Sequence, residues 1–250
     1  MKAVILCAGY ATRLYPLTLD KPKCLLPVSG KPVLNYAIEK IGKVKEIDEI
    51  LIVTNDKFYM DFVWWFNQNK ENFKKPVKIV NDGTTTNETR LGGLGDLWFA
   101  IEKEKINDDF LVILGDNLFG SDLDKIVDFF RDKKNMVVGV YDLKSLEKAR
   151  KFGVLEVENN EIISMEEKPE NPKSTLISTG IYVFKKENIK DIEEYMKTDN
   201  SKDGPGYLIM YFLSKGKKLY SFKLDGKWYD IGSKETYDEA NENWENNSGN

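Results

Sequence analysis

Five short runs of nearly continuous apolar residues, rich in Val, Ile and Leu, recur along the chain up to residue 142. They occupy residues 2–7, 49–55, 77–80, 110–116 and 136–142. Runs of this kind are typical of strands that are buried on both faces of a sheet. Amphipathic stretches separate them, around 33–43, 57–70, 93–105 and 122–134. This alternation predicts an α/β fold: a Rossmann-like, three-layer, mostly parallel sheet flanked by helices.

The second part of the chain follows a different pattern. Two strands are expected on either side of the polar turn Glu158–Asn160, and further elements follow at 176–186 (strand), 187–197 and 206–215 (helices), 217–222 (strand) and from about Ser233 (helix). Because no Gly/Ser-rich linker divides the two parts, we expect a single domain over 1–250. It would comprise a core over about 1–142, a smaller α+β lobe over about 143–232, and a C-terminal helix and tail over 233–250, whose end "NNSGN" is expected to fray.

Histidine is absent from the 250 residues. Its absence excludes Ser-His-Asp and Cys-His catalysis and metal sites with His ligands. The two cysteines, Cys7 and Cys24, do not make a disulfide framework, and Cys7 is expected to be a small core residue because it ends an apolar strand. Acid–base or metal chemistry therefore has to use Asp, Glu, Lys and Arg.

Charge and hydropathy restrict the partners of the chain. The formal net charge is −4 and lysines are spread along the sequence, which argues against nucleic acid as the main partner. No apolar run approaches the ~18 residues that a membrane span requires, and the stretch "AVILCA" is too short for a secretory signal. We expect a cytoplasmic protein with no membrane partner. Adjacent Trp64 and Trp65 predict core packing, with contact between two copies in a homo-oligomer as the alternative.

A turn of small residues follows the first strand directly. It reads Ala8, Gly9, Tyr10, Ala11, Thr12 and Arg13. Small residues let backbone N–H groups approach a phosphate, Arg13 can bind two phosphate oxygens at once, and Lys23 adds a point charge. The carboxyl ends of parallel strands are also where such sheets bind ligands. The turn therefore predicts an anion-binding site, with an ordinary surface loop as the alternative.

The segment "CAGYATRLYPLTLDKPKCLLPVSGKPVL" (7–34) resembles the N-terminal signature of the sugar-phosphate nucleotidyltransferases, AGxGTRLxPLT followed by PKxLLPV and KPxL. Ala11 stands where the family usually has glycine. The resemblance continues through "GDN" (115–117), "FGV" (152–154), "EEKP" (166–169), "STG" (178–180) and "WYDIG" (228–232). The resemblance covers nearly the whole chain. Because the sequence ends soon after the helix expected from Ser233, we expect it to lack the helical tail and the β-helix domain that longer relatives append.

The resemblance implies a reaction and roles for particular residues. A sugar-1-phosphate would attack the α-phosphorus of a nucleoside triphosphate and release pyrophosphate. Arg13 would hold the pyrophosphate, Lys23 would neutralise the α-phosphate, and Asp116 and Asp230 would bind Mg²⁺. The residues implied for the nucleotide are 8–13, Glu88 and Gly93, in the core. Those implied for the acceptor are Gly153, Glu167, Lys168, Thr179 and Gly180, in the smaller lobe.

The loop at 81–97 does not decide which nucleobase the protein binds. Members of this shape favour dTTP or UTP, but Glu88 falls near the family's base-reading glutamine. A carboxylate can accept a bond from a cytosine amino group and cannot donate to a uracil or thymine carbonyl, so Glu88 favours CTP. The alternatives are that Glu88 is an exposed loop charge, or that it pairs with Arg90, which could equally reach a phosphate.

Three other functions stay open. The first is a CTP-dependent cytidylyltransferase that acts on a non-sugar phosphate such as a polyol or aminoalkyl phosphate. The second is a glycosyltransferase with 122–124 ("DLD") as its metal motif, although these acids are better placed to open a helix. The third is a regulatory nucleotide-binding subunit without catalysis. Retention of Arg13, Lys23, Asp116 and Asp230 together argues against this last reading.

Overall fold

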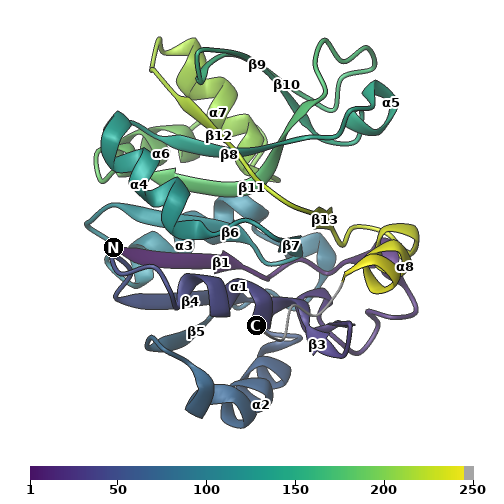
Figure 1. Ribbon diagram of the computed structural model, residues 1–250. Coiled ribbons are helices and arrows are strands. Elements are labelled where there is room, and N and C mark those ends of the chain that lie inside the picture. The colour runs from purple at the N-terminus through teal and green to yellow at the C-terminus, as the bar shows by residue number, and fades with distance from the viewer. Residues whose placement is uncertain (245–250) are drawn as a thin grey trace.

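A computed structural model of the protein describes residues 1–244; the tail prediction for 246–250 lies outside these residues (Figure 1). The main sheet has nine strands in the described chain, in the order β5-β4-β1-β6-β11-β8-β12-β10-β9. Their bounds are β1 Lys2–Leu6, β4 Glu49–Thr54, β5 Val77–Asn81, β6 Phe110–Leu114, β8 Val137–Asp142, β9 Gly153–Glu158, β10 Glu161–Glu167, β11 Leu176–Phe184 and β12 Tyr220–Lys223. Two small sheets pair β2 (Pro27–Val28) with β3 (Lys31–Pro32), and β7 (Asn117–Phe119) with β13 (Trp228–Asp230).

The α-helices are α1 Val33–Ile41, α2 Tyr59–Asn69, α3 Gly93–Lys103, α4 Leu123–Lys133, α5 Leu146–Ala149, α6 Asn188–Met196, α7 Pro205–Ser214 and α8 Lys234–Asn243. Short 3₁₀ helices occupy η1 Thr12–Leu14, η2 Lys23–Leu25, η3 Lys70–Asn72 and η4 Asn87–Thr89. The predicted strands and helices are found within a few residues of their expected ends. The elements missed were short ones, namely α5, the 3₁₀ helices and the four strands of the small sheets.

The first half of the sheet is parallel, as the strand–helix alternation predicts. β5, β4, β1 and β6 run side by side in the same direction, with Lys2 opposite both Glu49 and Phe110. β11 then runs antiparallel to β6 and separates it from β8. The Rossmann-like α/β fold is confirmed, with the refinement that the sheet becomes mixed beyond β6 and that 136–142 is not a neighbour of the other four early strands.

Alternate side chains of β1 pack into two different hydrophobic cores. Ala3 and Ile5 pack with the buried faces of α1, α2 and α4, whereas Val4 packs with those of α3, α6 and α7. The three layers predicted from the sequence follow from this alternation, because successive strand residues point to opposite faces of the sheet. On α2, Trp65 is buried and Trp64 is 66% exposed, so core packing explains Trp65 alone.

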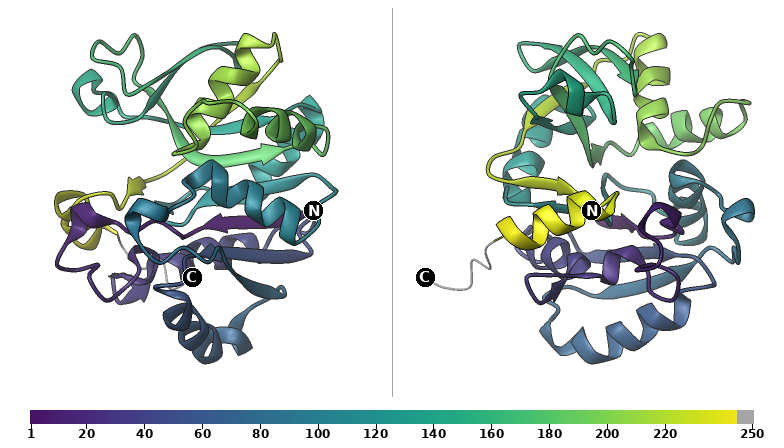
Figure 2. Two further views of the ribbon diagram at one scale, coloured as in Figure 1. Left: turned by 180° about the vertical axis from the view of Figure 1, so that it is seen from behind. Right: turned by 90° about the vertical axis from the view of Figure 1, so that its right-hand side faces the viewer.

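The end of the described chain returns to its beginning. β13 runs from the upper part of the sheet back to the purple N-terminal loops in Figure 1, where α8 docks; Figure 2 shows the same docking from the side. The hydroxyl of Tyr237 on α8 donates to the carbonyl of Pro27 over 2.7 Å. Within the described residues, no helix is long and apolar enough to cross a membrane.

Candidate active site

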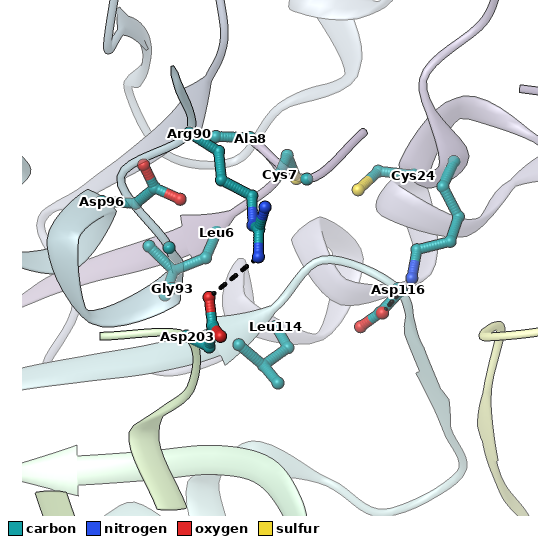
Figure 3. A pocket seen from close by; sticks show the side chains of 13 residues that line it. Leu6, Cys7, Ala8, Cys24, Arg90, Gly93, Asp96, Leu114, Asp116 and Asp203 are labelled. Atoms are coloured by element: carbon teal, nitrogen blue, oxygen red, sulfur yellow. Dashed lines mark hydrogen bonds and ion pairs between the residues drawn. The ribbon is translucent and has the colours of Figure 1, made fainter. Parts of the chain in front are cut away.

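Two cavities meet at the carboxyl ends of β1 and β6. The first cavity, 210 Å³, is lined by residues 6–9 at the end of β1 and just after it, by Lys23 and Cys24, and by residues at the start of α3 (Figure 3). The second cavity, 560 Å³, lies toward β9, β10 and β11. Leu114, Asp116 and Asp203 line both. The predicted strand-end site is therefore a double pocket with Asp116 at the junction.

Lys23 and Asp116 form an ion pair at this junction. The Lys23 ammonium donates to Asp116 Oδ2, and their side chains are only 16% and 20% exposed. Burial by itself lowers the pKa of Lys23, but the charges of Asp116 and Asp230 outweigh it and raise that pKa above its usual value. Burial likewise opposes ionisation of Asp116, and the Lys23 charge prevails and lowers its pKa. Both groups are held charged.

Asp230 comes to the same point from the far end of the chain. The small β7–β13 sheet sets Asp230 opposite Asn117, and the backbone N–H of Ile231 donates to the Asp116 carbonyl over 3.0 Å. Burial and the nearby Asp116 charge raise the pKa of Asp230 to about 7. The two carboxyls that the sequence predicts as partners therefore do lie together, with the Lys23 ammonium beside them.

Asn117 and Trp228 hold this arrangement in place and were not singled out from the sequence. The Trp228 indole N–H donates to Asn117 Oδ1 over 2.7 Å, and the Asn117 amide donates to the Leu114 carbonyl over 3.2 Å and to Asp116 Oδ1 over 3.3 Å. The "GDN" and "WYDIG" segments contain both residues. Their role depends on the pairing of β7 with β13, which joins residues more than a hundred positions apart.

The small-residue turn divides between the cavities. Ala8 and Gly9 line the first, and Arg13 lines the second. Arg13 is exposed and has no hydrogen bond or ion pair to other described residues, so its guanidinium is available. Tyr10 is buried, and its hydroxyl lies 3.2 Å from that of Thr84. Thr12 and Ala11 line neither cavity. Ala11 has φ 49° and ψ 41°, a left-handed conformation that favours glycine.

The loop before α3 places Arg90, and not Glu88, at the first cavity. Glu88 lies in η4, is exposed and is not among the lining residues, whereas Arg90 lines the cavity and bonds Asp203 Oδ1 over 3.3 Å. The CTP hypothesis, which depended on Glu88 facing the base, therefore has no support in this geometry. Gly93 also lines the cavity, and its N–H donates to the Asp203 carbonyl over 3.2 Å.

The five predicted acceptor residues all line the second cavity. They are Gly153, Glu167, Lys168, Thr179 and Gly180. Burial raises the pKa of Glu167, and its Oε2 lies 2.9 Å from where a Cβ on Gly153 would stand, so that glycine makes room for it. Thr179 is 1% exposed and donates to the Gly139 carbonyl over 2.8 Å. Because the hydroxyl hydrogen is used in this bond, the hydroxyl of Thr179 can serve a ligand only as an acceptor.

Asp96 lines the first cavity and has the carboxyl of Asp82 as a neighbour, a pair that no sequence pattern predicted. Asp96, in the first turn of α3, is 6% exposed, and its Oδ1 has no hydrogen-bond partner in the described chain; the same holds for Oδ2 of Asp82. Burial and the neighbouring Asp82 charge raise the pKa of Asp96 to about 8. Asp96 therefore holds its proton at neutral pH.

The sequence and the fold are both shared with known proteins. The family described as "Nucleotidyl transferase" matches residues 2–247, and the chain belongs to this family. It is 37% identical, over 93% of its length, to "Bifunctional protein GlmU" of Methanocaldococcus jannaschii. It is 33% identical, also over 93%, to "Bifunctional sugar-1-phosphate nucleotidylyltransferase/acetyltransferase" of Sulfurisphaera tokodaii.

A solved structure of UDP-glucose pyrophosphorylase with UDP-glucose superposes with a TM-score of 0.81 at 25% identity, covering 96% of this chain and 97% of that one. The matches to the two bifunctional proteins cover 51% and 52% of their lengths, so the chain spans about half of those relatives. The resemblance to sugar-phosphate nucleotidyltransferases that the motifs carry is confirmed at the level of the family, which is a family of nucleotide-transferring enzymes.

Proposed function

We propose that this protein is a Mg²⁺-dependent sugar-1-phosphate nucleotidyltransferase, which forms a nucleotide sugar and pyrophosphate from a nucleoside triphosphate and a sugar-1-phosphate. The observation that carries the proposal is the cluster of Lys23, Asp116 and Asp230 at the junction of two cavities. A transfer between two phosphates needs a nucleotide on one side and an acceptor on the other, with charge compensation where they meet.

The residues at the junction fit a hard cation. Asp116 and Asp230 supply carboxylate oxygens, which Mg²⁺ prefers, and Mg²⁺ usually takes one or two carboxylates and fills its other positions with phosphate oxygens and water. No group of three or more acidic or Cys side chains that could hold a metal occurs among residues 1–244, so the protein offers only part of a coordination shell. When bound, Mg²⁺ would offset negative charge on the reacting phosphates.

The side chains of this chain would divide the remaining work. Backbone groups of Ala8 and Gly9 would approach the triphosphate, and the unpaired Arg13 guanidinium would hold the leaving pyrophosphate. Lys23, kept protonated by its two acidic neighbours, would stabilise charge on the α-phosphate as the transition state forms. Lys168, 65% exposed at the second cavity, would bind the acceptor's phosphate, while Glu167 would bind sugar hydroxyls.

Pyrophosphate release is the decisive measurement. The enzyme would be incubated with MgCl₂, one of five nucleotides (dTTP, UTP, CTP, GTP or ATP) and one of a panel of sugar-1-phosphates and polyol or aminoalkyl phosphates. We expect release with a sugar-1-phosphate, its loss in EDTA, and a loss of turnover in the folded double variant Asp116→Asn/Asp230→Asn. Release only with a non-sugar phosphate would replace the proposal by the cytidylyltransferase-like alternative. Unchanged turnover in the double variant would refute the metal assignment.

A further inference from the structure

The two cysteines of the chain meet on the wall of the first cavity. Cys7 directly follows β1 and Cys24 lies in η2, and both are free and buried, at 3% and 4% exposure. A Cβ placed on Gly115 would stand 2.3 Å from the Cys7 sulfur and 2.9 Å from the Cys24 sulfur. The two sulfurs therefore lie no farther apart than the sum of these distances, with no side chain on Gly115 to keep them separate.

Both thiols also face the route by which small molecules reach the site. Cys7 and Cys24 line the first cavity together with Lys23 and Asp116, and Figure 3 shows the two sulfur atoms turned toward each other. A hydrogen peroxide molecule is little larger than water, so a cavity of 210 Å³ admits it. A nucleotide bound in this cavity, as the proposed function requires, would cover the same wall.

We propose that Cys7 and Cys24 are a modification site, at which a peroxide converts the two thiols into an intramolecular disulfide. The peroxide O–O bond breaks as the first sulfur is oxidised to a sulfenic acid, with release of one water. The second sulfur then attacks the first, the S–S bond forms, and the sulfenic oxygen leaves as a second water. Two thiol hydrogens are lost from the protein, and one peroxide is reduced.

The disulfide would act on the site through Lys23, which precedes Cys24 in the chain. A disulfide requires the sulfurs to approach to about 2 Å, which draws the end of β1 and η2 together. Cys24 is adjacent to Lys23, whose ammonium is fixed on Asp116, and a displacement of about 1 Å at such a group can cost on the order of 100-fold in rate. Burial raises the pKa of the Cys7 thiol, so the oxidation is expected to be slow, over minutes to hours.

The chemical test does not depend on activity. The reduced full-length protein and its Cys7→Ala and Cys24→Ser variants would be exposed to hydrogen peroxide, quenched by alkylation, unfolded, and examined by intact mass and thiol count. We expect the wild type to lose two hydrogens and both thiols together as a monomer, and dithiothreitol to restore both. Gain of oxygen without loss of both thiols, or disulfide-linked dimers, would overturn the proposal, as would a single-cysteine variant that shows the same loss of two hydrogens.

A second readout tests the link to the proposed function. Nucleotide with Mg²⁺ should slow disulfide formation at least tenfold, and oxidation should lower the turnover of the wild type at least tenfold, reversibly. Each single-cysteine variant is compared before and after peroxide treatment, and its turnover should stay the same. If the disulfide forms at the same rate with and without every nucleotide, the modification site is still supported, but the placement of the nucleotide in the first cavity is contradicted. A disulfide that forms without loss of turnover would overturn the coupling through Lys23.

Discussion

The ammonium of Lys23 donates to the carboxylate of Asp116 across 93 positions of sequence, and Asp230 approaches the same pair from the other end of the chain. This relationship links the 3₁₀ helix η2, the end of β6 and the antiparallel β7–β13 pair into one charged cluster. Each member depends on the others, since two buried carboxylates without the ammonium would repel one another. The cluster is therefore both the centre of the proposed chemistry and a structural joint.

Replacement of Lys23 by methionine should lower turnover by about 100- to 1,000-fold, the scale of removing one group that stabilises a transition-state charge. The same change leaves Asp116 without its partner and should cost about 3 kcal/mol of stability. Steady-state kinetics and urea unfolding measure the two effects. The control is Lys21→Met, an exposed lysine of the same loop, which should change neither. Near-normal turnover of the Lys23 variant would remove this residue from the mechanism.

Arg13→Gln should act on function with little effect on folding. The guanidinium is exposed and makes no hydrogen bond or ion pair with other residues of 1–244, although its charge weakly opposes the rise that burial causes in the pKa of Asp230. Its loss should therefore change the free energy of unfolding by less than about 0.5 kcal/mol. The value of kcat/KM should fall by about 10- to 100-fold, because a charge-assisted bond to phosphate is lost. The exposed Arg150→Gln is a matched control. Equal kinetics of the two variants would argue against phosphate binding by Arg13.

Asp96 predicts a pH-dependent stability. Its pKa is raised to about 8 in the folded chain, above the usual carboxyl value of about 4 in the unfolded chain. The folded chain then holds a proton that the unfolded chain releases, so stability should fall as pH rises from about 4 to 8 and level off above.

Asp96→Asn tests this prediction, because its amide can donate to Asp82 at every pH. At pH 9 the variant should be more stable than the wild type by about 2 kcal/mol, the scale of an uncompensated buried polar group. Near pH 4 the two proteins should be equally stable. Chemical denaturation across this range measures the difference, with exposed Asp199→Asn as the control. A constant difference at all pH values would mean that Asp96 is not protonated in the folded chain.

Ala11→Gly should stabilise the protein or leave it unchanged. The residue has φ 49°, and relief of the left-handed strain of about 1 kcal/mol is partly offset by the greater freedom of glycine when unfolded. Ala11→Val, which adds a β-branched side chain in the same conformation, should instead lower the melting temperature. If Ala11→Gly and Ala11→Val have the same melting temperature, the backbone of this turn differs from the one described. The KM for nucleotide in Ala11→Gly reports whether the methyl hinders triphosphate binding.

The base preference should respond to Arg90 and not to Glu88. Arg90 lines the first cavity, whereas Glu88 is exposed outside it. Arg90→Gln should alter kcat/KM for the preferred nucleotide relative to the other four by about 10-fold or more, a typical value for one polar contact. Glu88→Gln should leave the ratio unchanged. The Arg90–Asp203 pair is solvent-exposed and worth less than about 1 kcal/mol, so a large loss of stability in Arg90→Gln would mark a structural role. A changed ratio in Glu88→Gln would restore the CTP hypothesis.

The sequence by itself determined the longer strands and helices and, through its motifs, many of the residues of the site. The run "KAVIL" must be a buried strand because it offers no polar side to water beyond its first residue, and amphipathic stretches such as 123–133 must cover such strands. The motif resemblance carried Arg13, Lys23, Asp116, Asp230 and the acceptor residues, and the structure brings all of them to the two adjoining cavities. These are local patterns, which a linear chain displays directly.

Only the tertiary structure decided which distant residues touch. The insertion of β11 beside β6, the approach of both Cys7 and Cys24 to Gly115, and the effect of Asp82 on the pKa of Asp96 each join segments whose own patterns say nothing of the partner. Glu88 shows the reverse: the motif resemblance places it near the base, but in the structure it is exposed in η4 and does not line the first cavity. The physical reason is that burial and charge coupling arise from packing in three dimensions, so they exist only once the chain has folded.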